Sequence, residues 1–151
     1  MKKSLLTKIL ASGFYSGYSP IVPGTTGTIP AWLIAFFIVR GHPIGTPALA
    51  VALLLISVFL AGRAEAGFGH DAKKIVIDEW AGMFVALVFI PYSLTHYIIA
   101  FVAFRALDAV KIFPANAAEK LHGGWGVTAD DFVAGIQANL LTQLIIFAFK
   151  L

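Results

Sequence analysis

Five mainly apolar stretches, separated by short polar segments, dominate the chain. They cover residues 29–39, 48–61, 81–90, 97–113 and 132–149. Glycine, proline or charged residues bound these stretches, and such residues commonly mark the ends of helices. The pattern predicts an all-α protein, a polytopic membrane helix bundle with about five membrane helices, in a single domain over residues 1–151.

The segments before the third apolar stretch predict where helices begin. Residues 2–10 combine basic and apolar side chains, which predicts a short N-terminal interfacial helix. Residues 13–30 are rich in Gly, Pro, Ser and Thr and indicate a loop, as do residues 62–69. Asp71 can cap a helix that carries Lys74 and Asp78 on one face and continues to Ile90.

The second half of the chain contains further boundaries. Residues 91–93, Pro-Tyr-Ser, predict a turn that makes 81–90 and 97–113 separate helices. Residues 114–129 indicate a polar loop with several glycines. Residues 128–131 resemble a helix-start box, which predicts that the last helix begins there.

The composition favours lipid over water as the surroundings of these helices. Hydrophobic residues make up 59% of the chain and charged residues 13%, whereas soluble domains contain about 25% charged residues. The alternative is a soluble helical protein with a large core, because the apolar stretches are shorter than the roughly 20 residues usual for a membrane helix. The chain contains no cysteine, which excludes disulfides, thiolate metal sites and a cysteine nucleophile.

Five crossings would distribute the charged residues unevenly across the membrane. Every acidic residue falls on the side that holds the amino terminus. Of the 11 basic residues, only Arg40 and Lys150 fall on the opposite side. The excess of positive charge predicts that the acidic side faces the cytoplasm. This arrangement requires a real turn at residues 91–93, because a continuous helix there would separate Asp78 from Asp108.

The acidic residues at this boundary are the candidates for chemistry. Each has a structural alternative, since acids favour helix starts and Asp108 can pair with Arg105. Together, however, clustered carboxylates repel one another unless a cation or protons intervene. Oxygen ligands without a His/Cys pattern suit Mg²⁺, and Mg²⁺ beside Arg and Lys suits a phosphate ester. The expected cluster holds up to five carboxylates together with the cations Arg105 and Lys111. The carboxylates are Asp71, Asp78, Glu79, Asp108 and, in part, the pair Asp130 and Asp131.

Two glycine-rich segments are candidates for phosphate binding. Residues 23–28 and 122–126 could offer backbone N–H groups to phosphate oxygens. Ordinary turns are the alternative for both segments, and a lone histidine such as His122 is more often a surface residue than a ligand. The candidate phosphate-binding residues here are Thr25, Thr28, His122, Gly123 and Gly124.

Several short motifs follow one another between about residues 13 and 135, which is most of the chain. They are Ser19-Pro20 with Pro23-Gly24-Thr25 and Gly27-Thr28, then Ile75-Val76-Ile77-Asp78-Glu79, then Phe104-Arg105 with Asp108, Lys111 and Pro114, and finally Gly123-Gly124-Trp125-Gly126-Val127 with Asp130-Asp131. In this combination the chain resembles the phosphatidylglycerophosphatase A family of bacterial membrane phosphatases.

The resemblance implies an enzyme that removes the terminal phosphate of phosphatidylglycerophosphate and yields phosphatidylglycerol in phospholipid biosynthesis. It implies dependence on Mg²⁺ and a multi-pass location in the bacterial cytoplasmic (inner) membrane, with the active site facing the cytoplasm. The expected partners are this phospholipid and the membrane, with no nucleic acid. The functional carboxylates implied by the resemblance are Asp78, Glu79, Asp108, Asp130 and Asp131.

The absence of other phosphatase motifs narrows the expected mechanism. The chain has no cysteine nucleophile, no Asp-x-Asp-x-Thr run for an aspartyl-phosphate, and no phosphohistidine pattern. We therefore expect direct attack by water that Mg²⁺ activates, with Asp78, Glu79 or Asp130 as the general base. Arg105 and Lys111 are expected to bind the phosphate, and Asp71 and Lys74 are expected to have a supporting role.

A divalent-cation-binding membrane protein or transporter is the alternative from a different functional class. Carboxylates within a span would then form an ion pathway. Against this alternative, the acids lie at the ends of spans on one side, and none lies on the other side. Metal-dependent flux without phosphatase activity would distinguish the transporter from the enzyme.

Overall fold

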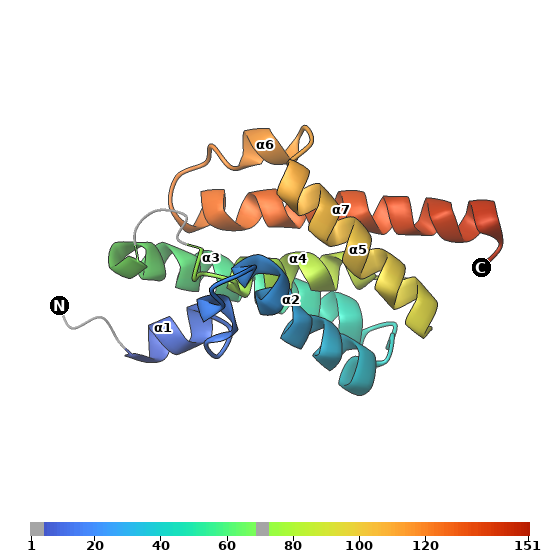
Figure 1. Ribbon diagram of the computed structural model, residues 1–151, viewed down its shortest axis with the longest axis horizontal. Coiled ribbons are helices and arrows are strands. Elements are labelled where there is room, and N and C mark those ends of the chain that lie inside the picture. Colours follow the sequence, from blue (N-terminus) through green and yellow to red (C-terminus); the bar gives the residue numbers. More distant parts are fainter. Residues whose placement is uncertain (1–4, 69–72) are drawn as a thin grey trace.

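The computed structural model describes residues 5–68 and 73–151, apart from the side chains of residues 65–68. Within these ranges all regular structure is helical, which confirms the predicted all-α class. A 3-10 turn η1 (Ser16–Tyr18) precedes α2, and a π-helical turn η2 (Ala35–Val39) extends it. The helices are α1 (Leu5–Ala11), α2 (Pro23–Ile34), α3 (Gly45–Phe68), α4 (Ile77–Leu87), α5 (Leu94–Val110), α6 (Ala115–Ala118) and α7 (Gly124–Phe149) (Figure 1).

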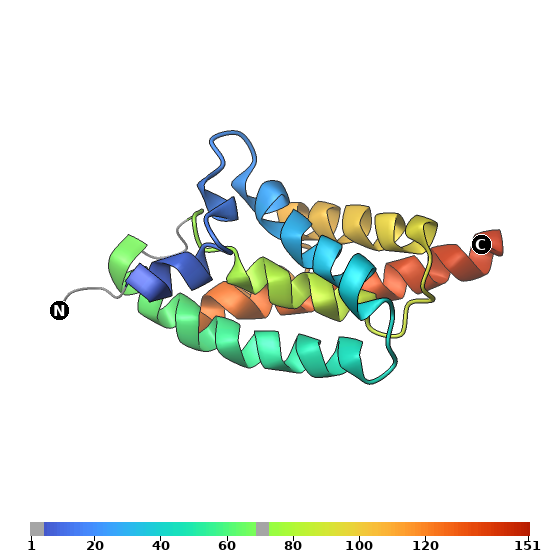
Figure 2. The ribbon, with the colours of Figure 1, turned by 90° about the horizontal axis from the view of Figure 1, so that it is seen from below.

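Helix α4 is the centre of the bundle. Nine of its 11 residues are buried, from Ile77 to Leu87. It packs against α2, α3, α5 and α7. In Figure 2, α4 lies between α3 on one side and α2 with α5 on the other. The acidic pair at the start of α4 is therefore surrounded by other helices.

The long helices alternate in direction, as the apolar stretches predicted. The starts of α2 and α4, the early part of α7 and the end of α5 line one pocket. A turn separates α4 from α5, and the Ser93 hydroxyl accepts a hydrogen bond from the His96 N–H at 3.1 Å to cap α5. The predicted turn at residues 91–93 is confirmed. It brings Asp78 and Asp108 into the same pocket.

Two predicted helix starts near the amino-terminal half were wrong. The helix expected to begin at Asp71 begins at Ile77: residues 73–74 form a turn, and Val76 has a non-helical backbone conformation and donates its N–H to Ala11 O at 2.9 Å. The loop expected over residues 13–30 ends at Pro23, where α2 begins. Proline suits the first helical turn because it has no N–H to satisfy there. Thr28 fits inside the helix because its hydroxyl oxygen lies 2.8 Å from Gly24 O, one turn earlier in α2.

Two predicted loops are helical for a different reason. Helix α3 continues through residues 62–68, and α7 begins at Gly124 rather than at Thr128. A Cβ on Gly124 would collide with the carbonyl of Val58 and would lie 2.8 Å from Gly62 N. These glycines therefore permit a close crossing of α3 and α7, whereas sequence analysis assigned them to loops. The short helix α6 also lies within the loop predicted over residues 114–129.

Helices α4 and α7 also cross at glycines. A Cβ on Gly135 would lie 2.5 Å from Gly82 O, and a Cβ on Gly82 would lie 2.6 Å from Asp131 O. Small residues allow helix backbones to approach closely, which is a common packing mode in membranes. This crossing holds Asp131 of α7 beside the first turns of α4.

The Gly135→Ala variant is expected to be less stable than wild type by about 1–3 kcal/mol, because the added methyl group meets a backbone carbonyl that cannot turn away. Alanine's higher helix propensity would act in the opposite direction. Thermal unfolding of the purified protein in detergent measures the change. Gly62→Ala is the graded comparison: its Cβ would lie 3.3 Å from Gly124 N, a tight contact for which a smaller loss is expected. Equal unfolding temperatures for both variants would contradict the close α4–α7 crossing.

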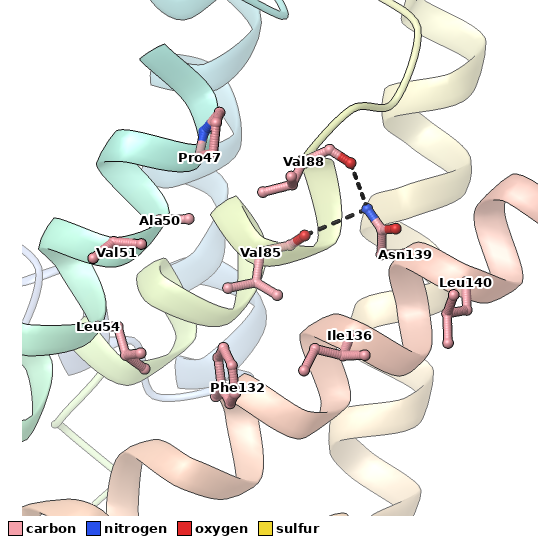
Figure 3. Close-up of a pocket in the computed structure, with 10 residues that line it drawn as sticks. All are labelled: Pro47, Ala50, Val51, Leu54, Val85, Val88, Phe132, Ile136, Asn139 and Leu140. Atoms are coloured by element: carbon pink, nitrogen blue, oxygen red, sulfur yellow. Dashed lines mark hydrogen bonds between the residues drawn. The ribbon is translucent and has the colours of Figure 1, made fainter. Parts of the chain in front are cut away.

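Carbonyl groups at the end of α4 accept hydrogen bonds from a side chain of α7 inside the bundle. Asn139 Nδ2 donates to Val88 O at 2.8 Å (Figure 3). It also donates to Ala86 O at 3.0 Å. Carbonyl groups at a helix end have no partner within the helix. Because Asn139 donates to these carbonyls, α4 can end inside the bundle without water to hydrogen-bond them. Asn139 borders an apolar groove of about 330 Å³ between α3, α4 and α7.

Among the described residues, two helices are long and apolar enough to cross a membrane: Gly45–Ala64 and Gly124–Phe149. The Pro23–Val39 segment is apolar but shorter, and α4, with 11 residues, extends only about 16 Å, roughly half of the hydrocarbon thickness. Large apolar side chains such as Phe147, 83% exposed, cover the outer surface. Such a surface suits lipid. Five crossings, and the interfacial position of α1, stay predictions.

Candidate functional site

One polar pocket of about 670 Å³ lies where the starts of α2, α4 and α7 meet the end of α5. Among the residues that the structure describes, its wall contains five carboxylates and three cationic side chains, which is a formal excess of two negative charges. The lining residues are Ile21, Val22, Pro23, Gly24, Thr25, Lys73, Ile75, Asp78, Glu79, Arg105, Asp108, Ala109, Lys111, Asp130 and Asp131.

Asp78 and Glu79 occupy the first turn of α4, where acids interact favourably with the helix macrodipole. Glu79 Oε2 accepts a hydrogen bond from the Thr28 hydroxyl at 2.8 Å and lies 3.5 Å from Arg105 Nη1. Asp78 is 7% exposed, and its Oδ1 has no hydrogen-bond partner among the described residues. The two neighbouring acids therefore differ: Glu79 is held by partners, whereas Asp78 has a free oxygen.

Arg105 connects the acids of two helices. Its Nη1 lies 2.6 Å from Asp108 Oδ2, one turn further along α5, as well as near Glu79. A Cβ on Gly24 would lie only 2.5 Å from Arg105 Nη2. The glycine at the start of α2 thus leaves the space that the guanidinium group occupies.

Lys111 connects α5 to α7. It ends α5 in a left-handed conformation, and its Nζ donates to Asp130 Oδ2 at 2.9 Å and to Glu119 Oε1 at 2.8 Å. Burial alone would lower the pKa of Lys111, but the hydrogen bonds and charges of Glu119 and Asp130 outweigh burial and raise this pKa above its ordinary value. Lys111 therefore stays protonated at neutral pH.

Three carboxylates of the pocket lie close enough together to share one ion. One oxygen each from Asp108, Asp130 and Asp131 lies within 4.8 Å of the others. Asp130 Oδ1 is buried and has no hydrogen-bond partner among the described residues. An all-oxygen donor set with unpartnered lone pairs and excess negative charge is chemically suited to a hard divalent cation. Asp78 and Glu79 line the same pocket but lie outside this set of three.

The other residues that sequence analysis singled out are dispersed. Thr25 lines the pocket. His122 and Gly123 are exposed and Gly124 is buried against α3, so none of the three is a lining residue. Lys74 is also absent from the lining, and its Nζ lies 4.8 Å from the ring centroid of Tyr18. Asp71 lies outside the described residues.

Sequence analysis missed two charged residues of this region. Lys73 lines the pocket, although the sequence singled out Lys74 beside it. Glu119 is the second partner of Lys111. The only signal for Lys73 was its place among the basic residues of one side. No sequence spacing predicted Glu119, because α6 and the turn before it bring it back to the end of α5.

A family model and two named relatives point to the same family. The family model described as phosphatidylglycerophosphatase A matches residues 9–146. Proteins named phosphatidylglycerophosphatase A from Escherichia coli and Haemophilus influenzae are 39% and 34% identical to this chain. These alignments cover 90% and 99% of this chain and 81% and 93% of the respective relatives.

A third relative carries a different substrate in its name. A Bacteroides thetaiotaomicron protein, provisionally named a phosphatidylinositol-3-phosphatase, is 32% identical over 93% of each chain. No solved structure matches the chain. The match over most of the chain, together with the clustered acids and cations, shows that this protein belongs to the phosphatidylglycerophosphatase A family.

Proposed function

We infer that the chain is a phosphoric monoester hydrolase that removes the terminal phosphate of phosphatidylglycerophosphate and releases phosphatidylglycerol. Family membership supports the reaction. The observation that carries the assignment to a site is the pocket in which Arg105, Lys111 and Lys73 face five carboxylates. Cations are needed to bind the phosphate, and carboxylates are needed to bind a metal and to accept a proton.

The phosphate would bind at the start of α2 and against the cations of α5. Gly24 and Thr25 lie in the first turn of α2, where backbone N–H groups have no partner within the helix and the macrodipole favours an anion. Arg105 and Lys111 line the same pocket. Since Arg105 is already held by Glu79 and Asp108, its position is set before the substrate arrives.

Mg²⁺ would be held by Asp108, Asp130 and Asp131. The close approach of their oxygens and the excess negative charge of the pocket support this assignment. When bound, Mg²⁺ supplies Lewis-acid chemistry: it withdraws charge from a phosphoryl oxygen and lowers the pKa of water. The chain's own residues then orient the phosphate and accept the proton.

The proton of the attacking water would pass to a carboxylate oxygen that has no protein partner. Asp78 Oδ1 and Asp130 Oδ1 meet this condition in the described part of the chain. Glu79 is less suited, because Oε2 already accepts from Thr28 and lies near Arg105. Lys111 keeps its charge beside Asp130 and would stabilise the negative charge that develops on the phosphate.

We place the protein in the bacterial cytoplasmic membrane as a multi-pass protein, with the pocket facing the cytoplasm. The two long apolar helices support insertion in lipid. The basic residues, which are concentrated on the side of the pocket, support the orientation. The head group of the substrate would then reach the acids from the cytoplasmic leaflet.

Phosphate release from phosphatidylglycerophosphate by purified protein is expected to require Mg²⁺. Chelation with EDTA should reduce the rate to background, because the five carboxylates would then repel the anionic substrate. Excess Mg²⁺ should restore the rate. A parallel assay with phosphatidylinositol 3-phosphate measures selectivity between the two lipids.

Each contrary result has a distinct meaning. Full activity in EDTA would reject the metal assignment and keep the phosphatase. No release of phosphate with Mg²⁺ present would reject the phosphatase. Metal-dependent flux in proteoliposomes without phosphate release would support the cation transporter instead.

A further inference from the structure

A second groove, about 240 Å³ in volume, lies between α2 and α5. Its wall is entirely apolar and consists of Ile29, Trp32 and Leu33 from α2 and Ile98 and Phe101 from α5. The same two helices form one side of the polar pocket. The groove and the pocket therefore share a seam between two helices.

The groove lies directly deeper along this seam. Ile29 follows the pocket residue Thr25 by one helical turn, and Phe101 precedes the pocket residue Arg105 by one turn. At 1.5 Å per residue, these groove residues lie about 6 Å beyond the pocket, and Leu33 lies about 12 Å beyond it. The order from the pocket inward is thus charged residues first and apolar residues next, as in a phospholipid.

Some side chains of the groove are exposed to the surroundings, whereas Trp32 is fixed by its contacts. Ile29 and Leu33 are each 41% exposed, and Ile98 is 48% exposed. Trp32 is held in place, because its Nε1–H donates to Tyr97 O at 2.8 Å and its ring stacks on Phe36 with centroids 5.2 Å apart. A flexible apolar chain could enter from the surrounding lipid without moving this tryptophan.

The other apolar groove does not have this relation to the pocket. It lies between α3, α4 and α7 and includes the amide of Asn139 in its wall (Figure 3). Among the side chains that the structure describes, α3 contributes none to the polar pocket, and α2 and α5 contribute none to this groove. A lipid with its phosphate between α2 and α5 would therefore not extend along α3.

We propose that the α2/α5 groove holds one acyl chain of the lipid substrate while the phosphate occupies the polar pocket. The substrate enters sideways from the bilayer between these two helices, and the groove selects lipid phosphates over water-soluble phosphate esters. This inference rests on the proposed phosphatase function. Ile21 and Val22, exposed apolar residues at the mouth of the pocket, are placed to contact the lipid above the groove.

The absence of native cysteine allows the groove to be filled after folding. Leu33→Cys and Ile98→Cys variants are purified and then modified with benzyl methanethiosulfonate, which a reductant removes again. Val51→Cys, in the groove between α3, α4 and α7, is the matched control at a similarly exposed apolar position. The kcat/KM for phosphate release is measured on dioleoyl phosphatidylglycerophosphate and on a dihexanoyl analogue, whose shorter chains would make fewer contacts in the groove. Both lipids are presented in micelles of the same composition.

Modification in the α2/α5 groove should lower the ratio of kcat/KM for the dioleoyl lipid to that for the dihexanoyl lipid by about tenfold, the effect of two methylene groups losing their contacts. Reductant should restore the ratio, and modified Val51→Cys should keep it. An unchanged ratio at both groove positions, or an equal decrease at Val51→Cys, would overturn the proposal. A wild-type protein that hydrolyses neither lipid would instead overturn the phosphatase function, and the groove proposal with it.

Discussion

The Asp130→Asn variant is expected to release phosphate at least about 100-fold more slowly than wild type. The substitution keeps the size of the side chain but removes the charge that Lys111 Nζ approaches at 2.9 Å. It also reduces the three-carboxylate set to Asp108 and Asp131. Initial rates across a range of Mg²⁺ concentrations measure the loss. If Asp130 acts chiefly as a metal ligand, excess Mg²⁺ restores part of the rate. If Asp130 acts chiefly as the proton acceptor, excess Mg²⁺ leaves the rate low.

Glu119→Gln is the matched control for this experiment. Glu119 contacts the same lysine at 2.8 Å but does not line the pocket. The Glu119→Gln substitution should therefore change the rate of phosphate release by only a few-fold. Asp78→Asn and Glu79→Gln complete the series. Rates near wild type for these two variants and for Asp130→Asn would reject the assignment of the acids.

The second large effect is expected for Arg105→Gln, with a decrease in kcat/KM of about 100-fold or more. The variant removes a cation expected to hold the phosphate. It also leaves Glu79 and Asp108 without the guanidinium group that now lies 3.5 Å and 2.6 Å from them. Unpairing these partly buried acids should reduce stability by about 1–3 kcal/mol. Kinetics and thermal unfolding in detergent together measure both effects.

Arg105→Lys distinguishes charge from geometry. Lysine keeps the positive charge but cannot present the planar guanidinium to two acids at once. We expect stability close to wild type and a partial recovery of kcat/KM. A full recovery would show that a point charge is sufficient, and it would contradict a role for the fixed guanidinium position. Equal loss in both variants would show that the geometry is decisive.

The direction of the helices and the convergence of the acids could be predicted from the sequence because both depend on the order of apolar stretches along the chain. Once residues 91–93 form a turn, Asp78 and Asp108 must lie at the same end of the bundle. Helix starts were less predictable. A glycine-rich segment such as 122–126 resembles a loop when its neighbours are unknown, since the close contact of Gly124 with Val58 exists only after α3 and α7 pack.

The sequence by itself determined the helical class, the family, and the five acids and two cations of the pocket, because spacing and residue type carry that information. Only the tertiary structure decided which of these side chains touch: Glu79 with Thr28 and Arg105, and Lys111 with Asp130 and Glu119. It also decided that Lys73 lines the pocket and that an apolar groove continues it. Contacts between helices depend on crossing points and rotations, and side chains far apart in the chain set these jointly.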